Sequence, residues 1–301
     1  MNEEFPGTGS ENETKMNVFI IGVGLIGGSF ALDIKAAEKQ AVISGIDASE
    51  DHLEKALELH IIDKKANLDM LGQADVVIVA IPVNAMLQLL PEVLDRVHDN
   101  ALVMDTGSTK ALICETVAHH PKRRNFLATH PVSGTEFSGP EAAHHGLYQH
   151  KTNIICEVEK TTFKLQECGL QLFNNLGMRI RYMDPESHDK HIAYVSHLSH
   201  ISSFMLGKTV MEKEKNERDI FDLAGSGFES TVRLAKSSPA MWTPIFEQNK
   251  ANVIETLEEY IVNLQQFKKL MLQHNFEAIY NEMESTNKIK DILNGIVTKT
   301  S

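Results

Sequence analysis

The pattern of hydrophobic and polar positions changes partway along the chain. From Asn17 onward, short apolar runs rich in β-branched residues alternate with longer amphipathic stretches, which is typical of a parallel sheet covered by helices. The runs are almost entirely apolar, as expected of strands buried on both faces. The predicted strands are Val18–Ile21, Val42–Ile46, Val76–Ile81, Leu102–Asp105, Phe126–His130, Asn153–Glu157 and Arg179–Met183. Residues 16–183 are therefore predicted to form an α/β domain.

The alternation stops after Met183, and residues 184–301 are predicted to be helical. Asp184 and Pro185 fit an N-cap followed by a first-turn proline. Between Met241 and Gln273, apolar residues recur at three- and four-residue spacing. They are Ile245, Val253, Ile254, Leu257, Ile261, Leu264, Phe267 and Leu270. This stripe is too long and too one-sided for an isolated surface helix, so we expect it to pack on other helices, including those of a second subunit in a homodimer.

Composition narrows the possible partners and compartment. The 301 residues include 41 acidic and 29 basic ones, giving a net charge of −12, and no concentrated basic patch is present, so nucleic acid is not an expected partner. Three cysteines in no metal-like spacing indicate a reducing compartment, which points to the cytoplasm. Residues 1–15 are polar and acidic and are expected to be a disordered tail. No apolar run approaches the length of a membrane span.

A glycine-rich turn gives the strongest local signal. The strand ending at Ile21 runs into Gly-Val-Gly-Leu-Ile-Gly-Gly at 22–28, and a helical pattern follows from Ser29. This strand–turn–helix context indicates a Rossmann dinucleotide site: one glycine for the tight turn, one for the approach of a pyrophosphate and one for helix–strand packing. The predicted cofactor-binding residues are Gly22, Gly24, Leu25, Ile26, Gly27 and Asp47. The alternative is a glycine turn that packs helix on strand without a ligand.

Asp47 indicates which cofactor the site takes. It ends the second predicted strand 20 residues after Gly27, where a carboxylate accepts hydrogen bonds from the ribose hydroxyls. A 2′-phosphate would meet that carboxylate directly, and no Lys or Arg follows in 48–51. NAD is therefore predicted rather than NADP.

Four further segments carry candidate chemistry. Asp105–Lys110 and His130–Glu136 each follow a predicted strand, so both belong at the carboxyl edge of the sheet, where doubly wound folds bind ligands. Ser108 or Asp105 could instead cap the next helix, and a lone strand-end His130 is often structural. The histidines of 188–200 could pack at a domain interface, contact substrate or bind metal, but no ligand set completes a metal site. Arg233, in a helix after a glycine turn, could bind a carboxylate or lie on the surface.

In this order and spacing, the motifs resemble those of prephenate dehydrogenases. They are Gly-Val-Gly-Leu-Ile-Gly-Gly-Ser at 22–29, Asp-Thr-Gly-Ser-Thr-Lys at 105–110, His-Pro-Val-Ser-Gly-Thr-Glu at 130–136, Ser-His-Leu-Ser-His at 196–200, and Gly-Phe at 227–228 separated by four residues from Arg233. The resemblance covers about residues 16–280. It implies a Rossmann domain followed by an all-α dimerisation domain. It also implies NAD-dependent oxidative decarboxylation of prephenate to 4-hydroxyphenylpyruvate, a step of tyrosine biosynthesis.

The resemblance also implies a role for each candidate residue. His130 accepts the proton of the substrate's C4 hydroxyl, and Ser108 hydrogen-bonds the same hydroxyl. Arg233 binds a substrate carboxylate. His200 and Thr135 contact the pyruvyl arm, and Glu136 and His197 lie behind them.

Three other functions remain open at this point. Glu229 is acidic where some relatives carry a base, so it could pair with the ammonium of arogenate. A β-hydroxyacid dehydrogenase shares the two-domain plan but needs a catalytic lysine early in the helical domain, and none lies between Lys190 and Lys208. A non-catalytic NAD-sensing module would not require Ser108, His130 and Arg233 to converge.

Overall fold

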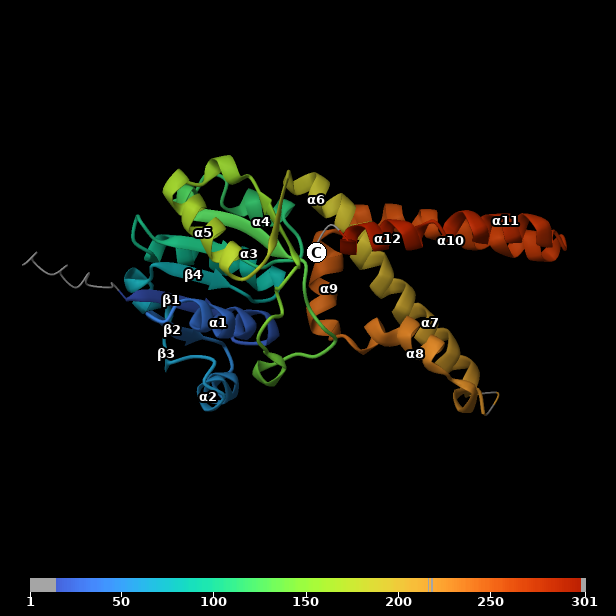
Figure 1. The fold of residues 1–301 in the computed structure, drawn as a ribbon, viewed down its shortest axis with the longest axis horizontal. Coiled ribbons are helices and arrows are strands. Elements are labelled where there is room, and N and C mark those ends of the chain that lie inside the picture. The colour runs from blue at the N-terminus through green and yellow to red at the C-terminus, as the bar shows by residue number, and fades with distance from the viewer. Residues whose placement is uncertain (1–14, 216, 218, 299–301) are drawn as a thin grey trace, which may run out of the picture. The chain divides into compact units, whose positions relative to one another are not determined.

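A computed structural model describes residues 15–215, 217 and 219–298. The chain divides into two compact units, Met1–Met183 and Asp184–Ser301 (Figure 1). The tail predicted at residues 1–15 lies outside the described residues except for Lys15. Because each unit has its own packing, each is described by itself.

The first unit is built on an eight-stranded sheet with strand order β3-β2-β1-β4-β5-β6-β7-β8. Every strand predicted from the apolar runs is present, with ends that differ by at most two residues. The strands are β1 (Met16–Ile21), β2 (Ala41–Ile46), β3 (Lys64–Lys65), β4 (Val76–Val79), β5 (Leu102–Asp105), β6 (Phe126–Pro131), β7 (Thr152–Cys156) and β8 (Arg179–Met183). Only the two-residue β3 was not expected, because two lysines carry no apolar signal.

The predicted parallel sheet extends from β1 to β6, and the direction reverses at the last two strands. Strand β7 pairs antiparallel with β6, and β8 pairs parallel with β7. The chain can turn back here because residues 132–151 contain no crossover α-helix, which a parallel connection needs. Strand β8 forms the sheet edge and is not buried on both faces, since Tyr182 is 55% exposed.

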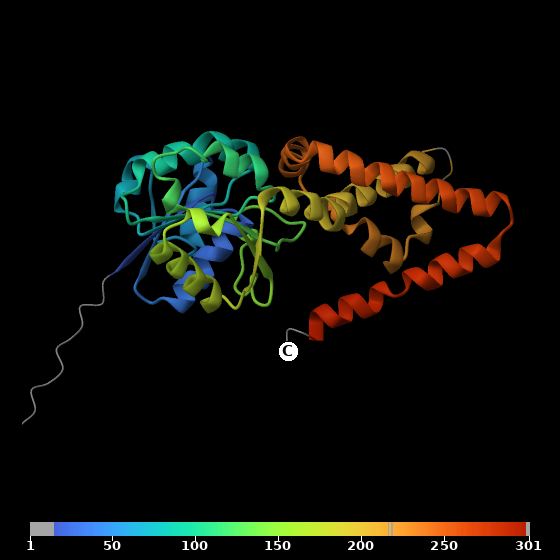
Figure 2. The same ribbon diagram turned by 90° about the horizontal axis from the view of Figure 1, so that it is seen from above.

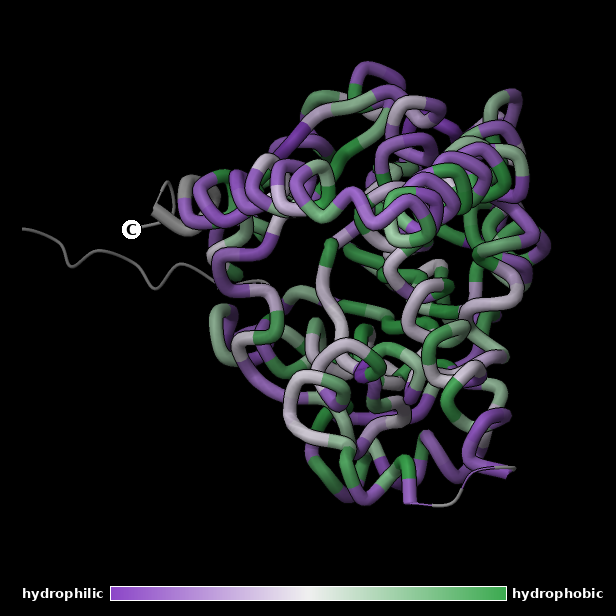
Figure 3. The backbone as a smooth tube through the Cα atoms, turned by 90° about the vertical axis from the view of Figure 1, so that its right-hand side faces the viewer, coloured by the Kyte–Doolittle hydropathy of each residue, from purple (hydrophilic) through white to green (hydrophobic). Residues whose placement is uncertain are grey.

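Helices cover both faces of the sheet (Figure 2). A buried apolar cluster joins one face of the central strands to the buried sides of α1 (Leu25–Ala37) and α5 (Phe163–Asn175). The helices α3 (Val83–Arg96) and α4 (Ala111–Thr116) lie on the opposite face, and α2 (Glu50–Glu58) follows β2. Hydrophobic stretches run through the interior (Figure 3), and strands β4, β5 and β6 are buried along their whole length, which places the core of this unit at the sheet.

The second unit is helical among the described residues. Its helices are α6 (Pro185–Ile192), a π-helix (Ala193–His197), α7 (Leu198–Glu214), α8 (Ser226–Val232), α9 (Pro239–Gln248), α10 (Lys250–Leu272), α11 (Phe276–Thr286) and α12 (Ile289–Thr298). Short 3-10 helices occur at Leu68–Gln73, Arg123–Asn125, Pro140–Ala142, Val158–Lys160, Phe221–Leu223 and Arg233–Lys236. The α/β unit followed by a helical unit confirms the predicted fold class.

The apolar stripe at 241–273 is carried by two helices. Helices α9 and α10 meet at Asn249, whose φ of −102° and ψ of 26° leave the α-helical region. Val253 and Leu270 are buried, while many of the other apolar side chains on α10 are exposed within this single chain. Exposed apolar residues there include Ile254, Ile261, Val262, Leu264 and Phe267. Among the described residues, no helix is both long enough and apolar enough to cross a membrane.

Candidate active site

Two glycines shape the turn between β1 and α1. Gly22 has a φ of +93°, and a Cβ atom there would lie 2.3 Å from the carbonyl oxygen of Ala80. A Cβ at Gly27 would lie 1.9 Å from the carbonyl oxygen of Gly22, so only glycine lets α1 pack this closely on the turn. The local geometry therefore requires glycine at both positions.

Gly24 has a different environment. Its φ is −74°, which any residue can adopt, and a Cβ there would have its nearest neighbour, the Gly139 amide nitrogen, 3.9 Å away. Protein packing therefore does not require glycine at this position, whereas a ligand approaching the backbone would.

Helix α1 begins at Leu25 rather than at the predicted Ser29. Gly24 is its N-cap, and none of the described side chains caps the helix. The amides of its first turn therefore point out of the helix end without a side-chain acceptor, which suits an anion such as a pyrophosphate.

Asp47 is held beside this turn. Its carboxylate accepts hydrogen bonds from the backbone N–H groups of Val23 at 3.0 Å and Ser49 at 2.9 Å. His52 Nδ1 lies 3.5 Å from the same carboxylate. Because a carboxylate has about four acceptor positions, these contacts fix its orientation and leave capacity for ribose hydroxyls.

A buried ion pair joins the ends of β5 and β6. The Asp105 and Lys110 side chains are fully buried and hydrogen-bonded to each other. Lys110 Nζ also donates to the carbonyl of Thr129 at 2.7 Å, and Asp105 accepts from the N–H groups of Thr129 and Gly107, each at 2.9 Å. The Thr129 hydroxyl donates to the Asp105 carbonyl. The paired register of β5 and β6 stops at Met104 and Leu127, so side chains hold the strand ends where the ladder has stopped.

This network fixes the backbone on either side of the two predicted catalytic residues. His130 directly follows Thr129 and is 7% exposed, and Ser108 directly follows Gly107 and is half-buried. The N-cap of helix α4 is Lys110, so neither Ser108 nor Asp105 occupies the capping position. Asp105 instead organises the turn that carries Ser108.

The segment after β6 packs along α1. The Tyr148 hydroxyl donates to the Ile26 carbonyl at 2.6 Å, and its ring stacks on Phe30. The Ser29 hydroxyl accepts from the His144 amide at 3.1 Å. Thr135 and Glu136 lie earlier in this segment and are both half-buried. The same segment therefore follows His130 and contacts the helix that begins at the glycine turn.

His197 in the second unit belongs to a buried polar cluster. Asn249 donates to the carbonyl of Asp189 at 2.7 Å and contacts His197 Nδ1 at 3.1 Å. Burial lowers the pKa of His197 to about 4, with Asp189 acting in the opposite direction. His197 is therefore neutral near pH 7, and because Nδ1 faces the donor nitrogen of Asn249, its proton lies on Nε2.

His200 lies one turn further along and stacks on Trp242. Their ring centroids are 3.4 Å apart at an interplanar angle of 27°. His200 Nδ1 is 3.0 Å from the Ser196 carbonyl, and burial lowers the pKa of the imidazole.

Sequence reasoning missed Trp242 and Asn249. One signal was available: Asn249 is a polar residue on the stripe between Ile245 and Val253, where the four-residue spacing calls for an apolar one. Trp242 is the only tryptophan of the chain.

Arg233 and Glu229 lie near each other in sequence and are both exposed within the chain. Arg233 follows α8 and begins a 3-10 helix instead of lying two turns inside an α-helix. Glu229 lies on α8 with its side chain 73% exposed and its carboxylate 3.6 Å from Lys236. In the part of the chain that the structure describes, no group of three His, Cys, Asp or Glu residues could hold a metal ion.

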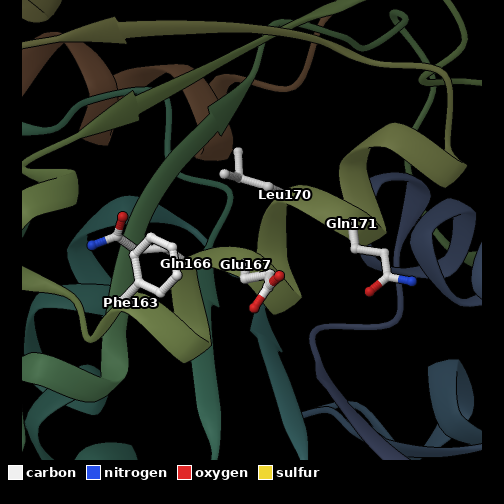
Figure 4. A pocket seen from close by; sticks show the side chains of 5 residues that line it. All are labelled: Phe163, Gln166, Glu167, Leu170 and Gln171. Carbon is white, nitrogen blue, oxygen red and sulfur yellow. The ribbon is translucent and has the colours of Figure 1, made fainter.

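A surface hollow on α5 is a separate feature (Figure 4). All of its lining side chains come from this one helix: Phe163, Gln166, Glu167, Leu170 and Gln171. They supply no imidazole, hydroxyl or guanidinium group, so this hollow is not the candidate active site.

Comparisons with known proteins agree with the fold. Residues 30–182 match the family model of the prephenate dehydrogenase nucleotide-binding domain, and residues 184–285 match that of the prephenate dehydrogenase dimerization domain. Prephenate dehydrogenase of Bacillus subtilis is 30% identical over 93% of this chain and 76% of its own length.

Two solved structures are similar over nearly the whole chain. Prephenate dehydrogenase from A. aeolicus, crystallised with hydroxyphenyl propionate and NAD+, is 31% identical with a TM-score of 0.84, covering 94% of this chain and 99% of that one. Arogenate dehydrogenase from Synechocystis is 25% identical with a TM-score of 0.74, covering 92% of this chain and 100% of that one. The family predicted from the motifs is confirmed: this chain belongs to the prephenate dehydrogenase family.

Proposed function

We propose that this chain catalyses the NAD-dependent oxidative decarboxylation of prephenate to 4-hydroxyphenylpyruvate. The observation that carries the proposal is the buried Asp105–Lys110–Thr129 network, which fixes a hydroxyl and an imidazole on adjacent strand ends of a dinucleotide-binding fold. Family membership supports the reaction class. Prephenate is favoured over arogenate because the relatives at 30% and 31% identity are prephenate dehydrogenases.

The residues of the glycine turn fit a dinucleotide. Space remains above Gly24, the first-turn amides of α1 have no capping side chain, and the carboxylate of Asp47 is oriented by two backbone amides. NAD, when bound, supplies the acceptor for the hydride that leaves the substrate ring. Gly22, Leu25, Ile26 and Gly27 complete the predicted binding turn.

His130 and Ser108 bind the substrate hydroxyl, and His130 takes its proton. Loss of hydride from C4 turns that carbon into a carbonyl carbon, so its hydroxyl must give up a proton. A neutral His130 accepts this proton, and Ser108 holds the same oxygen in line with it. Departure of CO2 then leaves an aromatic phenolate, which takes the proton back from His130 to give the product's phenol, and the gain of aromaticity makes the reaction irreversible.

The two carboxylates and the keto group of the substrate need binding partners of their own. Prephenate carries two carboxylates, and Arg233 can bind one of them through both of its oxygens. We assign His200 and Thr135 to the pyruvyl arm, with Glu136 and His197 supporting them. Glu229 is assigned no role in substrate choice, because its exposed carboxylate lies beside Lys236.

We also propose that the second unit forms a homodimer. The matched family model is that of a dimerization domain, and α10 to α12 expose several large apolar residues in the single chain. An apolar surface of this kind is typical of an interface between subunits.

The test is NADH formation with prephenate, arogenate and 6-phosphogluconate as separate substrates. The proposal predicts the highest kcat/KM with prephenate and NAD. A higher kcat/KM with arogenate would identify arogenate as the substrate, and turnover of 6-phosphogluconate would identify a β-hydroxyacid dehydrogenase reaction. If none of the three gives NADH while NAD binds, the chain is a cofactor-sensing module.

A further inference from the structure

The His200 ring is held on two sides. One face stacks on Trp242 with ring centroids 3.4 Å apart, and Trp242 itself packs against Phe246. The Nδ1 atom lies 3.0 Å from the Ser196 carbonyl, one turn earlier on the same helical segment. The ring therefore has little freedom to flip or to exchange its two nitrogens.

The Ser196 contact fixes where the ring proton lies. A carbonyl oxygen can only accept a hydrogen bond, so Nδ1 carries a hydrogen and donates it. Among the described residues none pairs with Nε2. The Nε2 atom of a neutral His200 is therefore an acceptor, and it becomes a donor only when the ring is protonated.

The surroundings of His200 keep the ring neutral before substrate binds. Burial lowers the pKa of His200, and the positive charge of Arg233 lowers it further, while the bond to Ser196 acts in the opposite direction. The other titratable group facing it is His197, which is neutral because burial lowers the pKa of His197 to about 4. Trp242 contributes no charge. No carboxylate of the described residues is among the groups that shift the pKa of His200.

We propose that His200 takes up one proton from solvent when a keto-acid arm binds and remains neutral when an amino-acid arm binds. This inference rests on the proposed function. The keto and carboxylate oxygens of a pyruvyl arm are acceptors only, so they need a donor at Nε2. The ammonium of an amino-acid arm is itself a donor, so it pairs with the neutral ring.

The proton taken up by His200 balances the negative charge that the bound arm brings. A pyruvyl arm brings a carboxylate close to Arg233 and His200, which offsets the repulsion between guanidinium and imidazolium. An amino-acid arm brings an ammonium as well, so protonating the ring would place two cations together. His200 therefore accommodates either arm, but only the binding of the keto acid depends on pH.

The test compares two stable probes that differ only in the arm, 4-hydroxyphenylpyruvate and tyrosine. Each is titrated by calorimetry into the enzyme saturated with NAD+ at pH 8, in two buffers with different ionisation enthalpies. The keto acid should bind with uptake of close to one proton per site, and tyrosine with close to none. Between pH 7 and pH 8, the Kd of the keto acid should rise about tenfold, while the Kd of tyrosine stays the same.

Two variants test whether His200 is the group that takes up the proton. His200→Gln keeps a planar polar group that does not titrate, so proton uptake and the pH dependence should both disappear. His191→Gln removes an exposed histidine of α6 and should leave both unchanged. Emission of Trp242, the only tryptophan, gives a second reading in the wild type, since a protonated imidazole stacked on indole quenches it. The keto acid should lower this emission more than tyrosine does.

The outcomes separate this inference from the proposed function. Absence of NADH formation from both prephenate and arogenate would reject the function. Turnover of prephenate together with equal proton uptake for both probes would overturn the role of His200 and leave the function standing. Proton uptake that persists in His200→Gln would overturn it as well, because the proton would then go to another group.

Discussion

Gly24 and Gly27 share one glycine-rich turn, yet the structure predicts opposite consequences for replacing them with alanine. The methyl group of Gly27→Ala would lie 1.9 Å from the Gly22 carbonyl oxygen and 2.8 Å from Ile20 Cγ2, so the start of α1 must move away from the sheet. Overpacking of this kind costs about 1–3 kcal/mol or more. At roughly 2–4 °C per kcal/mol, Tm should fall by about 2–12 °C.

Gly24→Ala should leave stability almost unchanged. Its nearest neighbour would be 3.9 Å away, and the backbone angles suit alanine. Alanine is a poorer N-cap than glycine, but it also restricts the unfolded chain, and these two effects of about 0.5–1 kcal/mol oppose each other. The methyl group would instead occupy the space that a pyrophosphate needs. A cost of about 1–3 kcal/mol in the bound state corresponds to roughly 5- to 150-fold weaker NAD binding.

Thermal unfolding followed by circular dichroism measures the stability of both variants, and calorimetric titration with NAD+ measures binding. Gly24→Ala should keep the wild-type Tm within about 3 °C and lose affinity, while Gly27→Ala should lose stability first. Wild-type NAD affinity in a well-folded Gly24→Ala would show that the cofactor does not approach this backbone. Equal losses of Tm in the two variants would show that the packing argument is wrong.

Three further predictions concern side chains. His130→Asn should lower kcat by about 10²- to 10⁴-fold while the Kd of NAD measured by titration stays nearly constant, and a loss of only a few-fold would remove His130 from the proton transfer. Lys110→Met leaves Asp105 buried without its cation, so it should lower the free energy of unfolding, measured in urea, by about 3–5 kcal/mol. Adding Asp105→Leu to Lys110→Met should recover part of this stability but not the activity. Full recovery of kcat in the double variant would contradict the positioning role of the ion pair. The pKa of His197 is about 4 in the folded chain against an ordinary value of 6.5, so the unfolded chain binds the extra proton between these values and stability falls as pH drops from about 6.5 to 4, by about 3 kcal/mol in total. Urea unfolding at pH 7 and pH 5 should show this loss in the wild type and a smaller one in His197→Gln, and an equal loss in both would assign the effect to other groups.

The elements that the sequence predicted correctly are those with a strong local signal. The apolar run Leu102–Asp105 was located to the residue because a buried strand needs little besides its own side chains. The early start of α1 was missed because Gly27 and Gly28 are poor helix formers, and the helix forms there through packing on the sheet. The reversal of β7 was missed because periodicity identifies a strand without giving its direction.

The candidate site also contains features that the sequence predicts and features that it does not. Turn residues and strand ends could be predicted because their positions follow from the strand–turn–helix pattern. The bridge between Asp105, Lys110 and Thr129 could not, since it joins two strands through buried side chains that are 19 and 24 residues apart in sequence. The contacts of Asn249 with Asp189 and His197 span 60 and 52 residues and likewise have no local signature.

The π-helix at Ala193–His197 determines on which side of the helical segment His200 lies. A single-turn π segment absorbs an inserted residue, and each residue turns an α-helix by about 100°. His188 and His200 are 12 positions apart and would point about 120° apart on an uninterrupted α-helix. With one residue absorbed, the angle falls to about 20°. Deleting one residue between 193 and 197 would leave a regular α-helix in which His188 and His200 are 11 positions apart, so the angle would stay at about 20°. A single-residue deletion in α6 after His188 would instead rotate His200 by about 100°, away from Trp242. Among descendants of this sequence, single-residue deletions should therefore be better tolerated at 193–197 than in the regular helix before it.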